Sequence, residues 1–126
     1  MPVSCLIVDD SDAFLRAARE LLQRGGINVV GTASTAAQAC HRCRELSPDV
    51  ALIDIDLGTD SGIDLARELA ACPDTSAPRV ILISAYSGED FADLIADSPA
   101  ISFLPKADLS AAKVRGILAR AGASPG

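Results

Sequence analysis

Short apolar runs alternate along the chain with segments in which apolar residues recur every three or four positions. The runs are partly β-branched, which is typical of strands buried on both faces of a parallel sheet, and the spaced segments have the period of amphipathic helices. We therefore predict five strands, at residues 3–8, 27–33, 50–53, 79–84 and 101–104. The helices that follow them are predicted at residues 11–24, 35–46, 61–72, 87–97 and 108–121.

Polar residues at the predicted helix starts support these boundaries, because their side chains accept hydrogen bonds from the free N–H groups of a first turn. These residues are Ser11, Thr35, Ser61, Ser87 and Asp108. Thr35 and Gln38 also have the pattern of a capping box. The alternation of strands and helices predicts an α/β fold, doubly wound, with a parallel sheet covered by helices on both faces. We predict one domain over residues 1–121 and a flexible tail over residues 122–126.

The composition excludes several classes of function. The 126 residues are 49% hydrophobic and 22% charged, as in an ordinary globular domain, and a formal charge of -6 argues against direct nucleic-acid binding. No apolar run approaches the ~20 residues that a membrane span requires. The first apolar run ends at Asp9 and has no basic region before it, which argues against a signal peptide and favours the cytoplasm.

The cysteines have a spacing that suggests metal or redox chemistry, but their context does not support it. They are Cys5, Cys40, Cys43 and Cys72. Cys40 and Cys43 flank His41, whereas a zinc site would need a second pair of ligands in a loop. A thioredoxin-type pair would lie at the start of a helix, and this pair falls in the middle of one. We interpret the cysteines as small buried apolar residues and His41 as solvent-facing.

Polar residues follow four of the five predicted strands, at the point where each strand ends. They are Asp9, Asp10, Asp54, Asp56, Ser84 and Lys106. The carboxyl ends of parallel strands share one edge of the sheet, which is where α/β folds bind ligands. Carboxylates ~5 Å apart repel each other by a few kcal/mol, and a divalent cation with oxygen ligands, such as Mg²⁺, relieves this repulsion. Asp54 is then the candidate nucleophile toward a phosphoryl group, with Lys106 and Ser84 as candidate contacts to phosphate oxygens.

The motifs around these residues resemble those of the receiver domains of two-component response regulators, including chemotaxis regulators. The motifs are LIVDD, LIDIDL, LISA and FLPKADL, and their spacing agrees with the family over nearly the whole chain. The resemblance implies a flavodoxin-like strand order, 2-1-3-4-5. It also implies that Asp54 accepts a phosphoryl group from a histidine kinase. Asp9 and Asp10 would hold Mg²⁺ together with Asp54, and the backbone carbonyl of Asp56 would complete the metal site.

The resemblance further implies a switch rather than a conventional enzyme, with only slow self-dephosphorylation. Ser84 and Lys106 match the family's hydroxyl and lysine positions, and Phe103 matches the aromatic residue that turns inward on activation. The fourth helix, fifth strand and fifth helix would form the output face. Asp56 and Tyr86 occupy positions that tune the lifetime of the phosphate in the family.

Some positions depart from the family pattern. Gly58 stands where the family usually has proline, so we expect a more mobile loop there. Lys106 is followed by Ala107 instead of proline, so the family's cis Lys-Pro bond is impossible and the lysine is expected to be less fixed. Asp56 adds a carboxylate beside Asp54, which would strengthen Mg²⁺ binding or alter the attack of water on the acyl phosphate.

Other functions stay open at this point. The Asp54-Ile55-Asp56 motif is similar to the D-x-D of haloacid-dehalogenase-type phosphatases, in which the second aspartate is an acid/base. That family has its motif near the N-terminus, whereas here it follows the third strand. A second alternative is a receiver that binds partners without being phosphorylated. The sequence also leaves open whether the chain stands alone or precedes an effector domain.

The helices of the predicted output face differ in charge. The acidic residues of the predicted helix at 87–97 are Glu89, Asp90, Asp93 and Asp97. The basic residues of the last helix are Lys113, Arg115 and Arg120. They form either two solvated surfaces or a symmetric homodimer in which the acidic helix of one protomer meets the basic helix of the other. By family resemblance, the kinase would dock on the first helix, which carries Arg16, Arg19 and Arg24.

Overall fold

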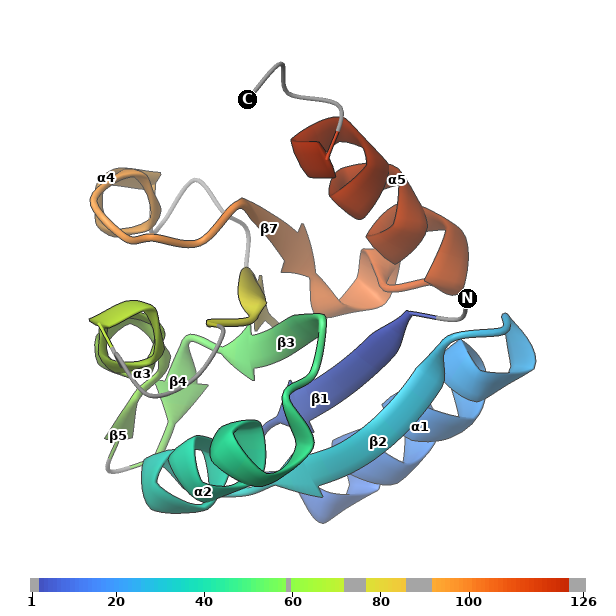
Figure 1. Ribbon diagram of the computed structural model, residues 1–126, viewed down its shortest axis with the longest axis horizontal. Helices are drawn as coiled ribbons and strands as arrows, with labels where there is room; N and C mark the ends of the chain where they lie inside the picture. The colour runs from blue at the N-terminus through green and yellow to red at the C-terminus, as the bar shows by residue number, and fades with distance from the viewer. Residues whose placement is uncertain (1–2, 59, 72–76, 86–91, 123–126) are drawn as a thin grey trace.

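The computed structural model describes residues 3–58, 60–71, 77–85 and 92–122, and its central feature is a five-stranded parallel sheet (Figure 1). The strands are β1 (Ser4–Val8), β2 (Asn28–Ala33), β3 (Val50–Asp54), β6 (Arg79–Ser84) and β7 (Ser102–Pro105). The helices are α1 (Asp12–Arg24), α2 (Ala36–Leu46), α3 (Gly62–Ala71), α4 (Ala92–Ala96) and α5 (Ala111–Gly122). The order β2-β1-β3-β6-β7 confirms the predicted α/β fold and its 2-1-3-4-5 topology.

Two apolar layers, one on each face of the sheet, form the core. Cys5 and Ile7 of β1 belong to the layer with α1 and α5, whereas Leu6 and Val8 belong to the layer with α2 and α3. Every residue of β3 is buried. A strand that is covered on both faces needs apolar side chains at successive positions, which explains the continuous apolar runs. Each fully buried Leu or Ile contributes ~1.5–3 kcal/mol to folding.

Three helices start at the predicted capping residues. The side-chain oxygens that accept first-turn N–H bonds are those of Ser11, Thr35 and Ser61. The predicted capping box of Thr35 is shifted, because Oε1 of Gln38 accepts from the N–H of Ser34, one residue earlier, at 2.9 Å. Asp60 adds a carboxylate at the start of α2, where its Oδ2 accepts from the N–H of Ala36 at 3.1 Å.

The predicted cap of the last helix at Asp108 is wrong. Asp108 ends a 3-10 turn, η2 (Lys106–Asp108), that directly follows β7. Leu109 then has an extended backbone, with φ -63° and ψ 126°, and its side chain is buried. This extended residue separates η2 from α5. Ser110 caps α5, because its Oγ accepts from the N–H of Lys113 at 3.1 Å.

Several predicted boundaries lie at the limits of the described residues. The start of the fourth helix at Ser87 is outside them, and the described part of that region contains α4, which ends at Ala96. The third helix ends at Ala71, and Cys72 is outside. The division between a domain over residues 1–121 and a tail stays a prediction, since residues 123–126 are not described.

Between β3 and α3 the chain forms a small antiparallel hairpin that the apolar pattern does not predict. Its strands are β4 (Asp56–Leu57) and β5 (Asp60–Ser61). Gly58 follows β4 with φ +76°, a left-handed conformation that proline cannot adopt and that other side chains disfavour. The glycine that replaces the family's proline therefore permits this turn.

Gly62 allows the start of α3 to lie directly against the end of β3. Its N–H donates to the carbonyl oxygen of Ile55 at 2.8 Å. A Cβ atom at residue 62 would lie 1.9 Å from the carbonyl oxygen of Asp54. Only glycine fits so close an approach, so Gly62 fixes α3 against the strand that carries Asp54.

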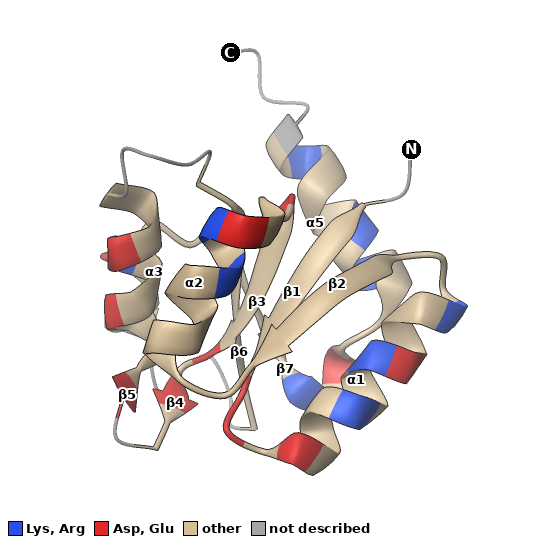
Figure 2. Ribbon diagram, turned by 60° about the horizontal axis from the view of Figure 1, so that its bottom comes forward, with Lys and Arg blue, Asp and Glu red and all other residues tan. Residues whose placement is uncertain are grey.

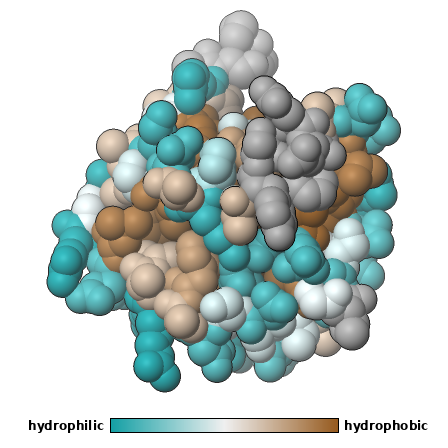
Figure 3. Space-filling model, turned by 180° about the vertical axis from the view of Figure 1, so that it is seen from behind, coloured by the Kyte–Doolittle hydropathy of each residue, from teal (hydrophilic) through white to brown (hydrophobic). Residues whose placement is uncertain are grey.

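Charged residues of both signs lie on the surface. Figure 2 shows acidic residues around the end of the sheet where β4 and β5 lie and also on α1, α2 and α3, and basic residues along α1, α2 and α5. On the face shown in Figure 3, apolar side chains gather in patches that hydrophilic side chains border. No helix within the described residues is both long enough and apolar enough to cross a membrane.

Candidate functional site

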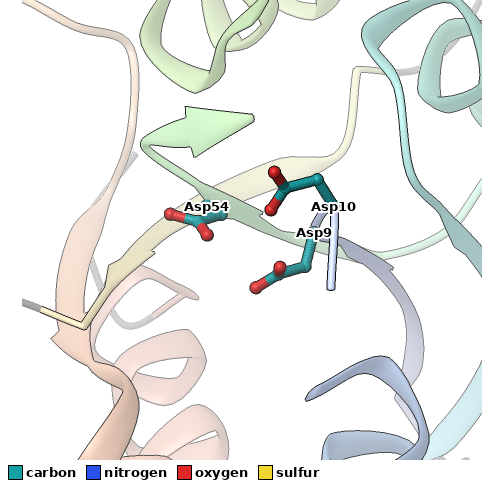
Figure 4. Close-up of side chains that lie close together, drawn as sticks. All are labelled: Asp9, Asp10 and Asp54. Atoms are coloured by element: carbon teal, nitrogen blue, oxygen red, sulfur yellow. The ribbon is translucent and has the colours of Figure 1, made fainter. Parts of the chain in front are cut away.

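Three aspartates meet at the carboxyl edge of the sheet (Figure 4). Asp9 and Asp10 follow β1, and Asp54 is the last residue of β3, the strand that pairs with β1. One carboxylate oxygen from each residue lies within 4.8 Å of the others. Asp9 and Asp54 are buried and Asp10 is exposed, so the group is open to solvent on the side of Asp10. The expected convergence of these acidic residues is therefore present.

Backbone N–H groups orient the two buried carboxylates. Oδ1 of Asp9 accepts from the N–H of Ser11 at 2.8 Å, and Oδ1 of Asp54 accepts from the N–H of Asp56 at 3.0 Å. These bonds leave Oδ2 of each carboxylate on the side of Lys106. A ligand that enters the site would meet preset oxygen atoms.

Lys106 brings a positive charge into this group. Its Nζ lies 2.6 Å from Oδ2 of Asp9 and 3.0 Å from Oδ2 of Asp54. The same atom lies 4.4 Å from the centroid of the Phe14 ring. Although Lys106 is followed by Ala107 rather than proline, the lysine reaches the acidic group.

Burial and ion pairing act in opposite directions on the site's pKa values. Burial raises the pKa of Asp54 above its ordinary value and repulsion by Asp9 adds to this, while the contacts with Lys106 and with the N–H of Asp56 oppose it. Burial lowers the pKa of Lys106, but the contacts with Asp9 and Asp54 outweigh burial, so the net shift is upward. The lysine therefore stays a cation between two buried carboxylates.

The chemistry of the three carboxylates indicates a metal site. One oxygen atom from each of Asp9, Asp10 and Asp54 lies within 4.8 Å of the others. Lys106 supplies only one positive charge to this group, through Asp9 and Asp54, so a further cation would offset the repulsion that remains among the carboxylates. Carboxylate oxygens that are open to water on one side are the ligands that Mg²⁺ prefers. Asp9, Asp10 and Asp54 therefore fit this ion, and the carbonyl of Asp56 stays a predicted ligand.

Ser84 and Phe103 lie on the two strands beyond β3. Ser84 is the buried last residue of β6, the strand between β3 and β7, and it pairs with Pro105. This places Ser84 between β3, which ends at Asp54, and β7, which Lys106 directly follows. Phe103 lies on β7 and packs, half-buried, against the layer with α2 and α3.

Of the two residues that are predicted to tune the lifetime of the phosphate, Asp56 and Tyr86, the structure describes only Asp56. The side chain of Asp56 is not part of the aspartate group described above. Its Oδ1 instead accepts from the N–H of Gly58 at 3.1 Å, which stabilises the turn of the hairpin. Tyr86 lies outside the described residues.

The Cys-x-x-Cys segment lies within α2, as predicted. Cys43 is buried, and Sγ of Cys40 donates to Oε2 of Glu68 on α3 at 3.6 Å. His41 is largely exposed, beside Glu45, which confirms that it faces solvent. Among the residues that the structure describes, only the aspartate group brings three potential metal ligands together.

Three residues that support the site were not found from the sequence. Phe14 repeats with the apolar residues of α1, so nothing in the sequence separates it from an ordinary core residue. Asp60 lies in a hairpin that the pattern does not predict. Gly62 did carry a signal, because glycine is often found where another part of the backbone has to come close.

The sequence matches the response regulator receiver domain family over residues 5–115. The chain therefore belongs to the family of response regulator receiver domains, and takes part in two-component signal transduction. The fold and the acidic edge of the sheet agree with this assignment, which replaces the phosphatase alternative.

The relatives of this chain include longer proteins. A protein-glutamate methylesterase/protein-glutamine glutaminase of Alkalilimnicola ehrlichii is 34% identical over 113 residues, which cover 87% of this chain and 29% of that protein. A putative transcriptional regulator of Pseudomonas aeruginosa is 32% identical over 102 residues, covering 80% of this chain and 48% of that protein. The chain thus spans less than half the length of these curated relatives. The signal receiver domain of the putative response regulator NarL from Mycobacterium tuberculosis has a TM-score of 0.80 and 28% identity, over 97% of this chain and 98% of that one.

Proposed function

We propose that the chain is a phosphorylation switch, in which Asp54 accepts a phosphoryl group from a histidine kinase. The observation that carries this proposal is the meeting of three carboxylates and one ammonium group at the carboxyl edge of the sheet. A nucleophilic carboxylate, oxygen ligands for a cation and a fixed positive charge are what phosphoryl transfer to an aspartate requires. Membership of the receiver family supports the same assignment.

In the transfer, a carboxylate oxygen of Asp54 attacks phosphorus, and the bond from phosphorus to the nitrogen of the kinase histidine breaks. The N–H of Asp56 keeps the Asp54 carboxylate oriented while the acyl phosphate forms. Asp9 and Asp10 would hold Mg²⁺ together with Asp54, and the bound ion would supply positive charge near the phosphoryl oxygens. Lys106 supplies a second positive charge next to the reacting carboxylate.

The switch follows from the charge that the phosphoryl group adds, about -1.5 to -2. Ser84 and Lys106 contact the new oxygens. The side chain of Phe103, on the strand β7 that precedes Lys106, then turns inward. The output face then consists of α4, β7 and α5. Asp56 and Tyr86 set the lifetime of the acyl phosphate.

A homodimer through this output face is part of the proposal, with one change from the sequence prediction. The guanidinium of Arg115 donates to the carbonyl oxygen of Gly25, so it belongs to the contact with the end of α1. Lys113, which is exposed on α5, and Arg120, which lines a surface pocket with Ile101 and Ile117, are the basic residues that remain for the interface. The cytoplasmic location stays a prediction from the sequence.

The proposal is tested by intact mass after incubation with acetyl phosphate, with and without Mg²⁺. Wild type should gain one labile phosphoryl group only with Mg²⁺, and Asp54→Asn should gain none. Asp64→Asn is the matched control, since it removes an exposed carboxylate on α3 and should be phosphorylated normally. A wild type that gains no mass would favour a phosphorylation-independent binding module, and continued release of phosphate without an adduct would favour a phosphatase.

A further inference from the structure

We propose that Phe14 is a positioning residue for Lys106, and that its ring holds the ammonium group beside Asp9 and Asp54 for the incoming phosphoryl group. This inference rests on the proposed phosphorylation of Asp54 and adds a residue that controls its rate. Phe14 does not touch the reacting atoms itself and acts through the lysine.

The contact has the geometry of a cation–π interaction. Nζ of Lys106 lies 4.4 Å from the centroid of the Phe14 ring, well inside the limit of ~6 Å for such contacts. The side chain of Lys106 is 20% exposed, so the contact with the ring is partly shielded from water. Cation–π contacts gain strength as the cation loses water.

The ring is tied to the acidic group by a short series of hydrogen bonds. Oδ1 of Asp9 accepts from the N–H of Ser11, and Oγ of Ser11 accepts from the N–H of Phe14 at 3.3 Å. The ring also packs against the layer formed with α1 and α5. One rigid segment therefore presents both a carboxylate and an aromatic ring to the same ammonium group.

Lys106 needs such an anchor. Its ammonium group ends a flexible four-carbon chain, which has many rotamers when it is not held. The ion pairs with Asp9 and Asp54 involve a compact point charge with rotatable donors, so they set its distance from two oxygens without fixing a single position. The ring adds a third contact from α1, a different element from β3, and the three contacts together define one position for Nζ.

The contact can be observed by NMR because the sequence has only two lysines, Lys106 and Lys113. Lys113 is exposed on α5 and serves as the internal control. In wild type labelled with ¹³C-lysine, the ring should shift the ε-methylene protons of Lys106 upfield of those of Lys113. Phe14→Leu should remove this difference and Phe14→Trp should keep it. An unchanged Lys106 shift in Phe14→Leu would overturn the proposal.

The consequence is tested by the initial rate of phosphorylation with acetyl phosphate and Mg²⁺. Phe14→Leu should react ~5-fold more slowly than wild type, and Phe14→Trp should restore most of the rate. If Phe14 only filled space, the Lys106 proton shift and the phosphorylation rate would not both depend on whether residue 14 is aromatic. If wild type is phosphorylated and Phe14→Leu reacts at the same rate, the role of Phe14 is overturned and the proposed function stands. If wild type is not phosphorylated at all, the proposed function itself is overturned.

Discussion

Replacing Gly62 by alanine tests the close packing that fixes Asp54. The new Cβ would lie 1.9 Å from the carbonyl oxygen of Asp54, 2.8 Å from its carbonyl carbon and 3.0 Å from Cα of Ile55. All three atoms belong to the backbone, so no side-chain rotation can relieve the contact. The start of α3 and the end of β3 must separate by roughly 1.5 Å before ordinary contact distances return.

The expected loss of stability follows from these contacts. Overpacking of this kind costs ~1–3 kcal/mol, and the separation also weakens the hydrogen bond from the N–H of Gly62 to Ile55, worth ~0.5–1.5 kcal/mol. Together these give a decrease of roughly 2–4 kcal/mol in the free energy of unfolding. The usual gain of ~0.5–1 kcal/mol from glycine to alanine in a helix is too small to offset it.

Gly116 provides the matched control, because a Cβ there would meet no atom within 4 Å. Gly116→Ala in the middle of α5 should raise the free energy of unfolding by ~0.5–1 kcal/mol. Both variants would be measured by urea unfolding followed by circular dichroism, with wild type in the same metal-free buffer. If Gly62→Ala unfolds at the wild-type midpoint while Gly116→Ala is stabilised, the close approach of α3 to β3 is refuted.

Three further predictions use other contacts of the fold. Burial raises the pKa of Asp54 above 3.8, so between the two pKa values the folded protein keeps a proton that the unfolded chain releases. The free energy of unfolding of the metal-free protein therefore keeps the whole contribution of Asp54 below pH 3.8 and loses it as the pH rises through the folded pKa. Asp54→Asn should lack this fall in urea unfolding, and parallel curves would contradict it. Asp60→Ala should lower the free energy of unfolding by ~0.5–2 kcal/mol, because the N–H of Ala36 at the start of α2 loses its acceptor. The control is Glu20→Ala, which removes the exposed ion-pair partner of Arg24 on α1 and should cost less than ~0.5 kcal/mol. Equal effects would argue against the contribution of Asp60 to the start of α2. Burial raises the pKa of the Cys5 thiol to about 12, so alkylation followed by peptide mass mapping should label Cys40 long before Cys5 in the folded protein, and the reverse order would refute this burial.

The fold could be predicted because its strands carry a strong local signal. A strand such as β3, buried on both faces, has to be apolar at successive positions, and that requirement is visible in the sequence without knowledge of its neighbours. The cap at Ser11 is equally local, since donor and acceptor lie three positions apart. The local signal is ambiguous at the start of α5, because Asp108 and Ser110 have the same capping chemistry two positions apart. The burial of Leu109 places the start of the helix at Ser110.

The supporting residues could not be predicted because their contacts join distant parts of the chain. Phe14 meets Lys106 only when α1 and β7 are both in place on the sheet. Asp60 reaches the start of α2 only after the hairpin has formed, and that hairpin depends on the positive φ of Gly58. A hydrophobic pattern records which face of an element is buried, but it does not record which side chains meet at the edge.

The same local arrangement occurs at three aspartates, and what separates them is their second oxygen. Asp9, Asp54 and Asp56 each accept, through Oδ1, the N–H of the residue two positions later. Such turns are a common way to end a strand, so an aspartate at a strand end is not by itself a sign of chemistry. At Asp9 and Asp54 the carboxylate is buried and Oδ2 faces Lys106, whereas Asp56 is exposed on the hairpin. The turn thus orients all three carboxylates, and burial beside the ammonium group of Lys106 is what distinguishes Asp9 and Asp54 from Asp56.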